Sequence, residues 1–368
     1  CVLLVAKDGK IVYEKSYGSY TYDNPEPVTP ESVYDVASIT KICATTISLM
    51  KLYDEGKLDL KKKLGEYLPF VKGTNKEQLT IENLLLHQAG LVPYIPFYKE
   101  TTDSAGVPLP GIYNKDKNDT FSIRVAENVY IRQDWKDSIM IRILNSPVNN
   151  PGKYVYSDND FIFLGMVVEK ISGLSLDEYV KKQFYRPMSL STAGFLPRQR
   201  VSLNRIVPTE TETGFRKQTL RGDVHDPGAA MLGGIAGHAG LLSNAYDIAV
   251  IMQMLLNGGT LNDKRYLHQE TVALFTNYQS KISRRGYGFD KPEKDNAKRP
   301  EPYPALSASA ATFGHLGFTG TCTWADPERN LVFVFLSNRV HPAANELFST
   351  LNVRSKIFET IYQSLPRK

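Results

Sequence analysis

The spacing Ser-x-x-Lys occurs twice in this chain, at Ser38–Lys41 and at Ser48–Lys51. Residues three apart lie on one face of a helix, so in each pair the lysine amine can approach the serine hydroxyl. A serine beside a group that takes its proton is the beginning of a nucleophilic site. The two matches cannot both carry this chemistry, so their surroundings must separate them.

The surroundings favour the first serine. Ser48 lies in the middle of a helical pattern, where serine most often bonds its own backbone. Ser38 follows an extended run at residues 33–37 and begins the helix, where the helix dipole favours developing negative charge. The same place also suits an N-cap, so Ser38 alone fits a nucleophile and a cap equally well.

A lysine alone is a poor base for this serine. Its ordinary pKa is about 10.4, and removing its proton at pH 7 costs about 4.6 kcal/mol. A second group must therefore share the proton transfer. Tyr156 is the candidate, although it is one of 21 tyrosines and a tyrosine before a helix is more often packing.

Three runs in order carry a resemblance to a known family: residues 38–41 (Ser-Ile-Thr-Lys), residues 151–158 (Pro-Gly-Lys-Tyr-Val-Tyr-Ser-Asp) and residues 314–321 (Gly-His-Leu-Gly-Phe-Thr-Gly-Thr). They resemble the motifs of the serine β-lactamase-like superfamily. The branch of class C β-lactamases, D-alanyl-D-alanine carboxypeptidases and family VIII esterases is the most similar. Residues 84–91 and 237–243 extend the resemblance over nearly the whole chain.

The resemblance implies a role for each matching residue. Ser38 would be the acylated nucleophile, Lys41 its proton partner, and Tyr156 the base and later the acid toward the leaving group. Which of Lys41 and Tyr156 is the base stays open, because the two would titrate as a coupled pair. The backbone N–H groups of Ser38 and Phe318 would form the oxyanion hole. Substrate-binding positions would be Asp158, His315 and Gly317.

Two of these positions depart from the family pattern. Asp158 stands where the second motif usually ends in asparagine, so it accepts hydrogen bonds but cannot donate an amide N–H. It would also keep Lys41 as an ammonium and shift the base role toward Tyr156. Asn159 is a possible partial substitute. His315 replaces lysine and is mostly neutral at pH 7, which weakens its hold on a substrate carboxylate.

These departures favour an esterase or D-amino-acid peptidase-like serine hydrolase, which is at most a weak β-lactamase. It would cleave a small ester, amide or peptide, including peptidoglycan fragments, without a cofactor or metal. Two alternatives stay open: an accessory β-lactamase-like domain of a β-N-acetylhexosaminidase fusion with a family 3 glycoside hydrolase, and a penicillin-binding receptor. The resemblance also implies a periplasmic or extracytoplasmic location in a bacterium.

Composition and short sequence runs argue against several other classes of protein. The chain has 368 residues, is 42% hydrophobic and 23% charged, and carries a net charge of +5. Its basic residues are dispersed apart from the run Lys61–Lys63, which argues against nucleic-acid binding. No stretch approaches the roughly 20 apolar residues of a membrane-spanning helix. The run at residues 223–226 (Asp-Val-His-Asp) lacks metal-ligand spacing, and the Gly-rich run 232–240 is expected as a tight turn near the cleft floor.

The element pattern predicts an α/β (α+β) fold with strands at both chain ends. Strands are expected at residues 2–6, 10–17, 317–324 and 331–337, and these most economically form one antiparallel sheet. Helices are expected at 81–87, 161–171, 176–183, 245–256 and 345–364, with long loops at 94–120 and 285–304. The expected division is a sheet lobe of residues 1–65 and 300–368 and a mainly helical region of residues 66–299, part of which packs back on the sheet, as in β-lactamase/transpeptidase-like folds.

Overall fold

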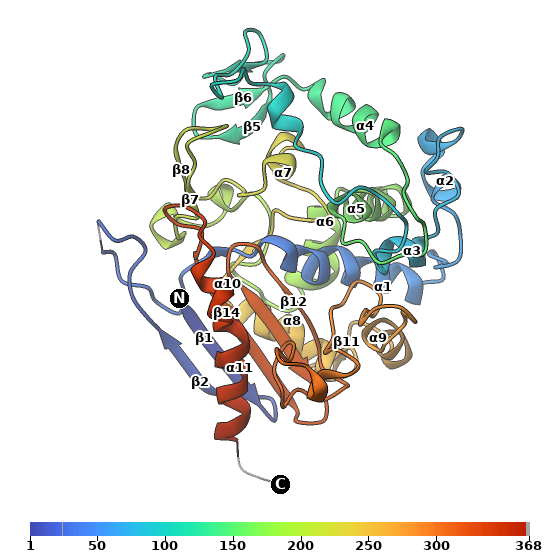
Figure 1. Cartoon of the computed structure of the whole chain (residues 1–368), viewed down its shortest axis with the longest axis vertical. Coiled ribbons are helices and arrows are strands. Elements are labelled where there is room, and N and C mark those ends of the chain that lie inside the picture. Colours follow the sequence, from blue (N-terminus) through green and yellow to red (C-terminus); the bar gives the residue numbers. More distant parts are fainter. Residues whose placement is uncertain (24, 366–368) are drawn as a thin grey trace.

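The structure, a computed structural model, describes residues 1–23 and 25–365. Its largest sheet is antiparallel with the order β12-β13-β14-β1-β2 (Figure 1). The five strands are β1 (Val2–Lys7), β2 (Lys10–Ser16), β12 (Phe313–Leu316), β13 (Cys322–Asp326) and β14 (Leu331–Leu336). The prediction that both chain ends share one sheet is confirmed, because β1 pairs with β14 from Val2↔Leu336 to Lys7↔Leu331.

Helices cover both faces of this sheet. All six residues of β14 are buried, and they alternate between two cores. Phe333 faces α11 (Val353–Ser364), where its ring stacks on that of Phe358 with centroids 4.6 Å apart. Val334 faces the opposite side, on which α8 (Ala245–Leu256) packs against β1, β13 and β14. In Figure 1, α11 lies in front of the sheet and α8 behind it.

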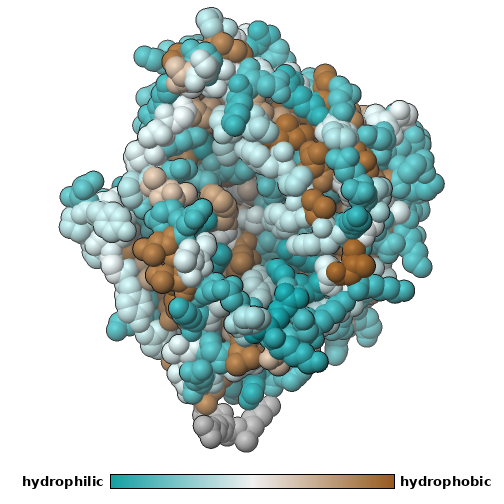
Figure 2. Space-filling view, in the orientation of Figure 1, coloured by the Kyte–Doolittle hydropathy of each residue, from teal (hydrophilic) through white to brown (hydrophobic). Residues whose placement is uncertain are grey.

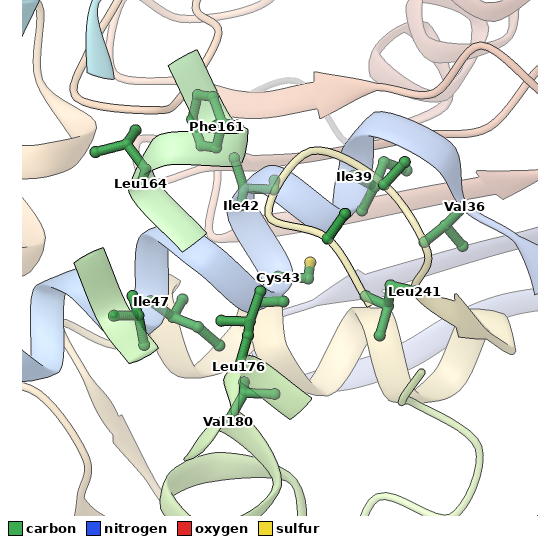
Figure 3. Close-up of a cluster of buried hydrophobic side chains, with 14 of the residues drawn as sticks. Val36, Ile39, Ile42, Cys43, Ile47, Phe161, Leu164, Leu176, Val180 and Leu241 are labelled. Carbon is green, nitrogen blue, oxygen red and sulfur yellow. The ribbon is translucent and has the colours of Figure 1, made fainter. Parts of the chain in front are cut away.

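The segment that carries the first Ser-x-x-Lys motif forms one continuous helical run. A 3-10 turn (η1, Ala37–Ile39) leads into a π-helical stretch (η2, Lys41–Thr46) and then into α1 (Ile47–Asp54). This run is buried against α5 (Asp158–Ser172) and α6 (Leu176–Val180), as the cluster in Figure 3 shows. Ile42 and Phe161 both belong to that cluster, so the helix is anchored on its inner face.

The remaining elements surround this core. The other helices are α2 (Leu64–Tyr67), η3 (Pro69–Val71), α3 (Ile81–Leu85), η4 (Phe97–Glu100), α4 (Trp135–Asn145), η5 (Lys181–Tyr185), η6 (Pro197–Gln199), η7 (Leu203–Arg205), α7 (Pro227–Met231), α9 (Gln269–Thr276), η8 (Asn296–Lys298) and α10 (Leu347–Thr350). The short strands are β3 (Tyr34–Asp35), β4 (Tyr113–Asn114), β5 (Ile123–Ala126), β6 (Val129–Ile131), β7 (Glu210–Thr211), β8 (Thr219–Leu220), β9 (Leu242–Ser243), β10 (Thr260–Leu261) and β11 (Lys264–Arg265).

Two predicted elements were wrong in their extent. The strand expected at 317–324 is a tight turn followed by β13: the Gly317 N–H donates to the Thr321 carbonyl, and Gly320 has a φ of +100°. The helix expected at 345–364 is broken into α10 and α11, because Asn352 adopts the left-handed conformation with φ +50°. Asparagine tolerates this conformation better than most residues, so hydrophobic spacing alone does not reveal either break.

The visible face is mostly hydrophilic, and hydrophobic residues gather beside α4 in the helical part (Figure 2). Within residues 1–23 and 25–365, no helix has the length and apolar character needed to cross a membrane.

Candidate active site

The backbone before Ser38 is held in an unusual conformation. Ala37 has a φ of +46°, a backbone conformation that residues other than glycine rarely adopt. Its N–H donates to Asp35 Oδ1 at 2.8 Å, and the buried Asp35 also accepts from the His225 N–H at 2.7 Å. A left-handed residue next to a candidate nucleophile, fixed by a buried carboxylate, is typical of a constrained functional site.

Ser38 and Lys41 meet as the motif predicts. Lys41 Nζ donates to Ser38 Oγ at 2.9 Å, and Ser38 itself is partly exposed. The second match behaves as a structural serine, because the buried Ser48 Oγ donates to the Ala44 carbonyl at 2.7 Å. Their surroundings therefore differ as the sequence predicts, and Ser38 as the nucleophile stays a prediction.

Lys41 is fully buried and fully hydrogen-bonded. Besides Ser38, its amine donates to Asp158 Oδ1 at 2.6 Å and to the His238 carbonyl at 3.1 Å. Burial alone would lower the pKa of Lys41, but Asp158 and Tyr156 raise it above its ordinary value. The resting site therefore holds Lys41 as an ammonium ion.

Tyr156 reaches the same serine from a segment more than a hundred residues away. Its hydroxyl donates to Ser38 Oγ at 2.9 Å. Burial raises the pKa of Tyr156 above its ordinary value, although Lys41 opposes this shift. The resting Tyr156 is therefore a phenol, and Ser38 Oγ accepts from two protonated donors.

A buried histidine and a buried aspartate lie behind Tyr156. The centroid of the His87 ring is 4.4 Å from that of the Tyr156 ring, and His87 Nδ1 lies 2.8 Å from Asp160 Oδ2. Burial lowers the pKa of His87 well below its ordinary value and raises the pKa of Asp160. His87 follows α3 with a φ of +56° rather than lying inside that helix. It therefore packs against the Tyr156 ring as a neutral imidazole.

Ser38 and Phe318 line the same cleft. Among the residues that the structure describes, neither the Ser38 N–H nor the Phe318 N–H donates to another protein group. A Cβ on Gly317 would stand 2.5 Å from the Val36 carbonyl oxygen, so only glycine permits this close approach of the two segments. The hydroxyls of Thr319 and Thr321 donate to backbone carbonyls of residues 35 and 36, which ties the turn to the serine segment.

The third-motif histidine is neutral and supports an arginine. Burial lowers the pKa of His315 to about 3, and Arg285 contributes to this shift. Its Nδ1 lies 2.7 Å from the Leu316 carbonyl oxygen and donates to it, which leaves Nε2 to accept from Arg285 Nη1 at 3.2 Å. Arg285 also donates to the Tyr154 hydroxyl at 3.0 Å. The cation beside the Tyr156 ring is therefore Arg285, and His315 accepts a hydrogen bond from it.

Asp158 and its neighbour have different positions. Asp158 lines the cleft and pairs with Lys41, whereas the buried Asn159 donates from Nδ2 to the Val92 carbonyl at 2.8 Å. The Asn159 amide is therefore bonded away from the cleft and does not replace the missing asparagine amide, the alternative that the sequence left open.

These residues line a cleft of about 610 Å³. It contains every predicted side chain except Lys41, which lies beneath Ser38, together with residues that the sequence did not assign to the site. The added charged and aromatic lining residues are Tyr94, Tyr154, His225, Asp226, His238, Arg284, Arg285, Asp290, Tyr303, Arg339 and Arg354. The long loop predicted from residue 285 was the one sequence signal for Arg285. The turn predicted at 232–240 near the cleft floor is confirmed by His238.

Comparison of the sequence with known proteins finds a matching family model and related bacterial proteins. Residues 1–355 match the family model described as Beta-lactamase. A protein of Escherichia coli (strain K12) named "Putative D-alanyl-D-alanine carboxypeptidase" is 35% identical over 366 residues, covering 92% of this chain and 78% of that protein.

Solved structures share the fold at lower sequence identity. A penicillin-binding protein homologue from Caulobacter crescentus superposes with a TM-score of 0.70 and 20% identity, covering 99% of this chain and 92% of that chain. A class C beta lactamase from Rhodobacter sphaeroides superposes with a TM-score of 0.68 and 17% identity, covering 99% of this chain and 94% of that chain. EstCE1, described as a hydrolase with promiscuous acyltransferase activity, superposes with a TM-score of 0.67 and 19% identity, covering 96% of this chain and 91% of that chain.

Proposed function

Because this chain belongs to the beta-lactamase family and is a serine hydrolase, we propose that Ser38 is its nucleophile and that Lys41 and Tyr156 move the protons of the reaction. The observation that carries this proposal is the pair of contacts at Ser38 Oγ, where the Lys41 amine and the Tyr156 hydroxyl each lie 2.9 Å away. No ordinary packing requirement brings a buried amine and a buried phenol to one partly exposed hydroxyl.

The reaction follows from these positions. Ser38 Oγ attacks a carbonyl carbon while its proton passes to the Lys41–Tyr156 pair, and the carbonyl oxygen takes the electron pair and is bound by the Ser38 and Phe318 N–H groups. When the intermediate collapses, the bond to the leaving group breaks and the leaving atom takes a proton from Tyr156. Water then attacks the acyl-enzyme by the same route, releasing the acid product and Ser38.

The protonation states of Lys41 and Tyr156 determine which form of the site can react. With both pKa values raised, the resting pair holds the Lys41 ammonium and the Tyr156 phenol. Neither can accept the proton of Ser38, so attack requires a pair with one proton fewer. The rate is therefore expected to rise with pH toward the alkaline range.

The cleft supports a small peptide, peptidoglycan-derived fragment or ester as substrate. Arg285 is a permanent cation beside Tyr156 and suits a carboxylate on the leaving group, as in a peptide with a free carboxyl end. Asp158 cannot offer the amide N–H of the usual asparagine, so β-lactam turnover is expected to be weak. Relatives of bacterial origin named as carboxypeptidases favour a site of action outside the cytoplasm. Fusion to a glycoside hydrolase stays a prediction.

Covalent labelling tests this function. The purified chain is incubated with a fluorescent fluorophosphonate or with fluorescent penicillin, and the labelled peptide is identified by mass spectrometry. We expect fluorophosphonate on Ser38, loss of labelling in Ser38→Ala, and unchanged labelling in the matched control Ser48→Ala. A lasting penicillin adduct would favour the receptor, and no adduct with either probe would favour the accessory domain. Loss of labelling in Ser48→Ala would move the nucleophile to Ser48.

A further inference from the structure

Charged side chains line both ends of the cleft. At one end the Arg285 guanidinium lies 5.4 Å from the centroid of the Tyr156 ring and 3.6 Å from Asp290 Oδ1. At the other end the exposed Phe318 ring stacks on the His225 ring with centroids 5.5 Å apart and lies 5.0 Å from the Arg339 guanidinium. Asp226, the residue after His225, lines the same cleft. A substrate lying across Ser38 therefore meets cations at both ends and the Asp226 carboxylate on the Phe318 side.

The proposed reaction determines which part of the substrate meets each end, so the following step rests on that function. The leaving atom must face Tyr156, because it takes its proton from that hydroxyl. The carbonyl oxygen must face the Ser38 and Phe318 N–H groups. The remaining substituent of the carbonyl carbon, the acyl chain, then points away from Tyr156 and toward the end that contains Asp226.

Asp226 is held in place with one oxygen available. Its Oδ1 accepts from the Ala229 N–H at 2.7 Å and from His238 Nε2 at 2.9 Å. Among the residues that the structure describes, Oδ2 has no hydrogen-bond partner, and the side chain is 21% exposed. Burial alone would raise the pKa of Asp226, but His238 and the Ala229 N–H lower it below its ordinary value. The cleft therefore contains a fixed carboxylate with an unused acceptor.

The surroundings of Asp226 favour a cation over a neutral donor. His238 is 3% exposed and its Nε2 already bonds to Asp226 Oδ1, which leaves Oδ2 as the oxygen that a ligand can reach. Tyr94 lines the same cleft near enough to Asp226 to feel its charge, and the residue is 40% exposed, so its ring is accessible to a bound ammonium group. A carboxylate and an aromatic ring together recognise a primary ammonium group.

We propose that Asp226 binds a protonated primary amine on the acyl part of the substrate, so that the preferred substrates are aminoacyl compounds rather than neutral acyl esters. The amine can be the α-amino group of the acyl residue or the side-chain amine of a diamino acid. Both place an ammonium group on the acyl side of the scissile bond. Asp226 is thus a specificity-determining residue outside the matched motifs.

Protection of Ser38 from fluorophosphonate measures this preference even where turnover is slow. The labelling rate is followed with increasing D-alaninamide, with N-acetyl-D-alaninamide as the neutral counterpart and with Nα-acetyl-D-lysinamide as the side-chain amine. We expect at least one of the two amines to protect about 10- to 100-fold more tightly than the neutral amide, the range of a charge-assisted hydrogen bond. The more tightly bound amine identifies the source of the ammonium group.

The variant Asp226→Asn tests the residue itself. Asparagine keeps an Oδ1 acceptor for Ala229 and His238 but removes the charge, so the ratio between protection by the amine and protection by the neutral amide should fall to about one. The matched control is Asp223→Asn, three residues earlier. The Asp223 carboxylate accepts from Arg124 Nε at 2.7 Å and does not line the cleft, so this variant should keep the preference for the amine.

Three results overturn the inference: no amine preference in the native chain, including no protection at all; a preference that persists in Asp226→Asn; and loss of Ser38 labelling in Asp226→Asn, which would mean a structural role through His238. Failure of the native chain to label at Ser38 would instead refute the proposed function, since the amine preference is measured on a labelled serine.

Discussion

Replacing Asp158 by asparagine should move the pH dependence of the reaction downward. Asp158 is the anion beside the buried Lys41 ammonium, with Oδ1 2.6 Å from Nζ. Asparagine keeps an oxygen in that place and removes the charge. Because Asp158 raises the pKa of Lys41, its removal should let burial lower that pKa and release the proton of the pair at lower pH.

The size of the shift follows from the geometry. Two unit charges 2.6 Å apart interact by about 6 kcal/mol at an effective dielectric constant of about 20. The Asp158 side chain is 24% exposed, so water screens part of this energy. An opposite charge at such range usually shifts a pKa by about 1–3 units, which is about 1.4–4 kcal/mol. In Asp158→Asn we expect the acid limb of the pH profile of kcat/KM to move about 1–3 pH units lower than in the native chain.

The assay is the pH profile of p-nitrophenyl butyrate hydrolysis, corrected for spontaneous hydrolysis, for the native chain and for Asp158→Asn. The profile of the fluorophosphonate labelling rate gives an independent measure of the same ionisation. The sign is definite: attack needs the deprotonated pair, so a lower pKa raises the rate at any pH below the limb. An acid limb that stays in place, or moves upward, would show that Asp158 does not control the protonation of Lys41.

Two further changes test other parts of the site. Gly317→Ala would bring a methyl group to within 2.5 Å of the Val36 carbonyl and push the Phe318 N–H away from Ser38, so kcat should fall about 100-fold, the loss typical of one oxyanion donor. Equal kcat in the native and variant chains, with both folded by circular dichroism, would remove Phe318 from the oxyanion hole. Arg285→Met should raise KM about 10- to 100-fold for a D-alanyl-D-alanine peptide with a free carboxyl end and leave a neutral ester within about threefold. Equal losses for both substrates would assign Arg285 a structural role.

Hydrophobic spacing and turn chemistry predicted most of the fold because they act locally. The strands at both chain ends, α5 and α8 follow from patterns within a few residues, and one antiparallel sheet was the simplest way to satisfy two distant hairpins. The turn at residues 317–321 was missed because its cause lies elsewhere in the chain. The hydroxyls of Thr319 and Thr321 bond to the backbone of residues 35 and 36, which no nearby residue indicates.

The same limit applies to the site. Ser38 and Lys41 were predictable because a helix sets their spacing, and Tyr156 was reached through the resemblance rather than through its own surroundings. Arg285 and Asp226 were not predicted as site residues, since their importance depends on how two distant loops meet at the cleft. The neutral state of His315 was expected from its ordinary pKa, but its hydrogen bond with Arg285 was not, because the two residues are 30 positions apart.

The pairing of β1 with β14 has a consequence for how the chain folds. Val2 is synthesised more than three hundred residues before its partner Leu336, so this strand pair cannot close until Leu336 has left the ribosome. Contacts of such large sequence separation slow folding and leave strand edges uncovered for longer. The threonines that hold the serine segment also belong to this late part. Until both threonines have left the ribosome, the segment that carries Ser38 lacks the contacts that hold it against the turn.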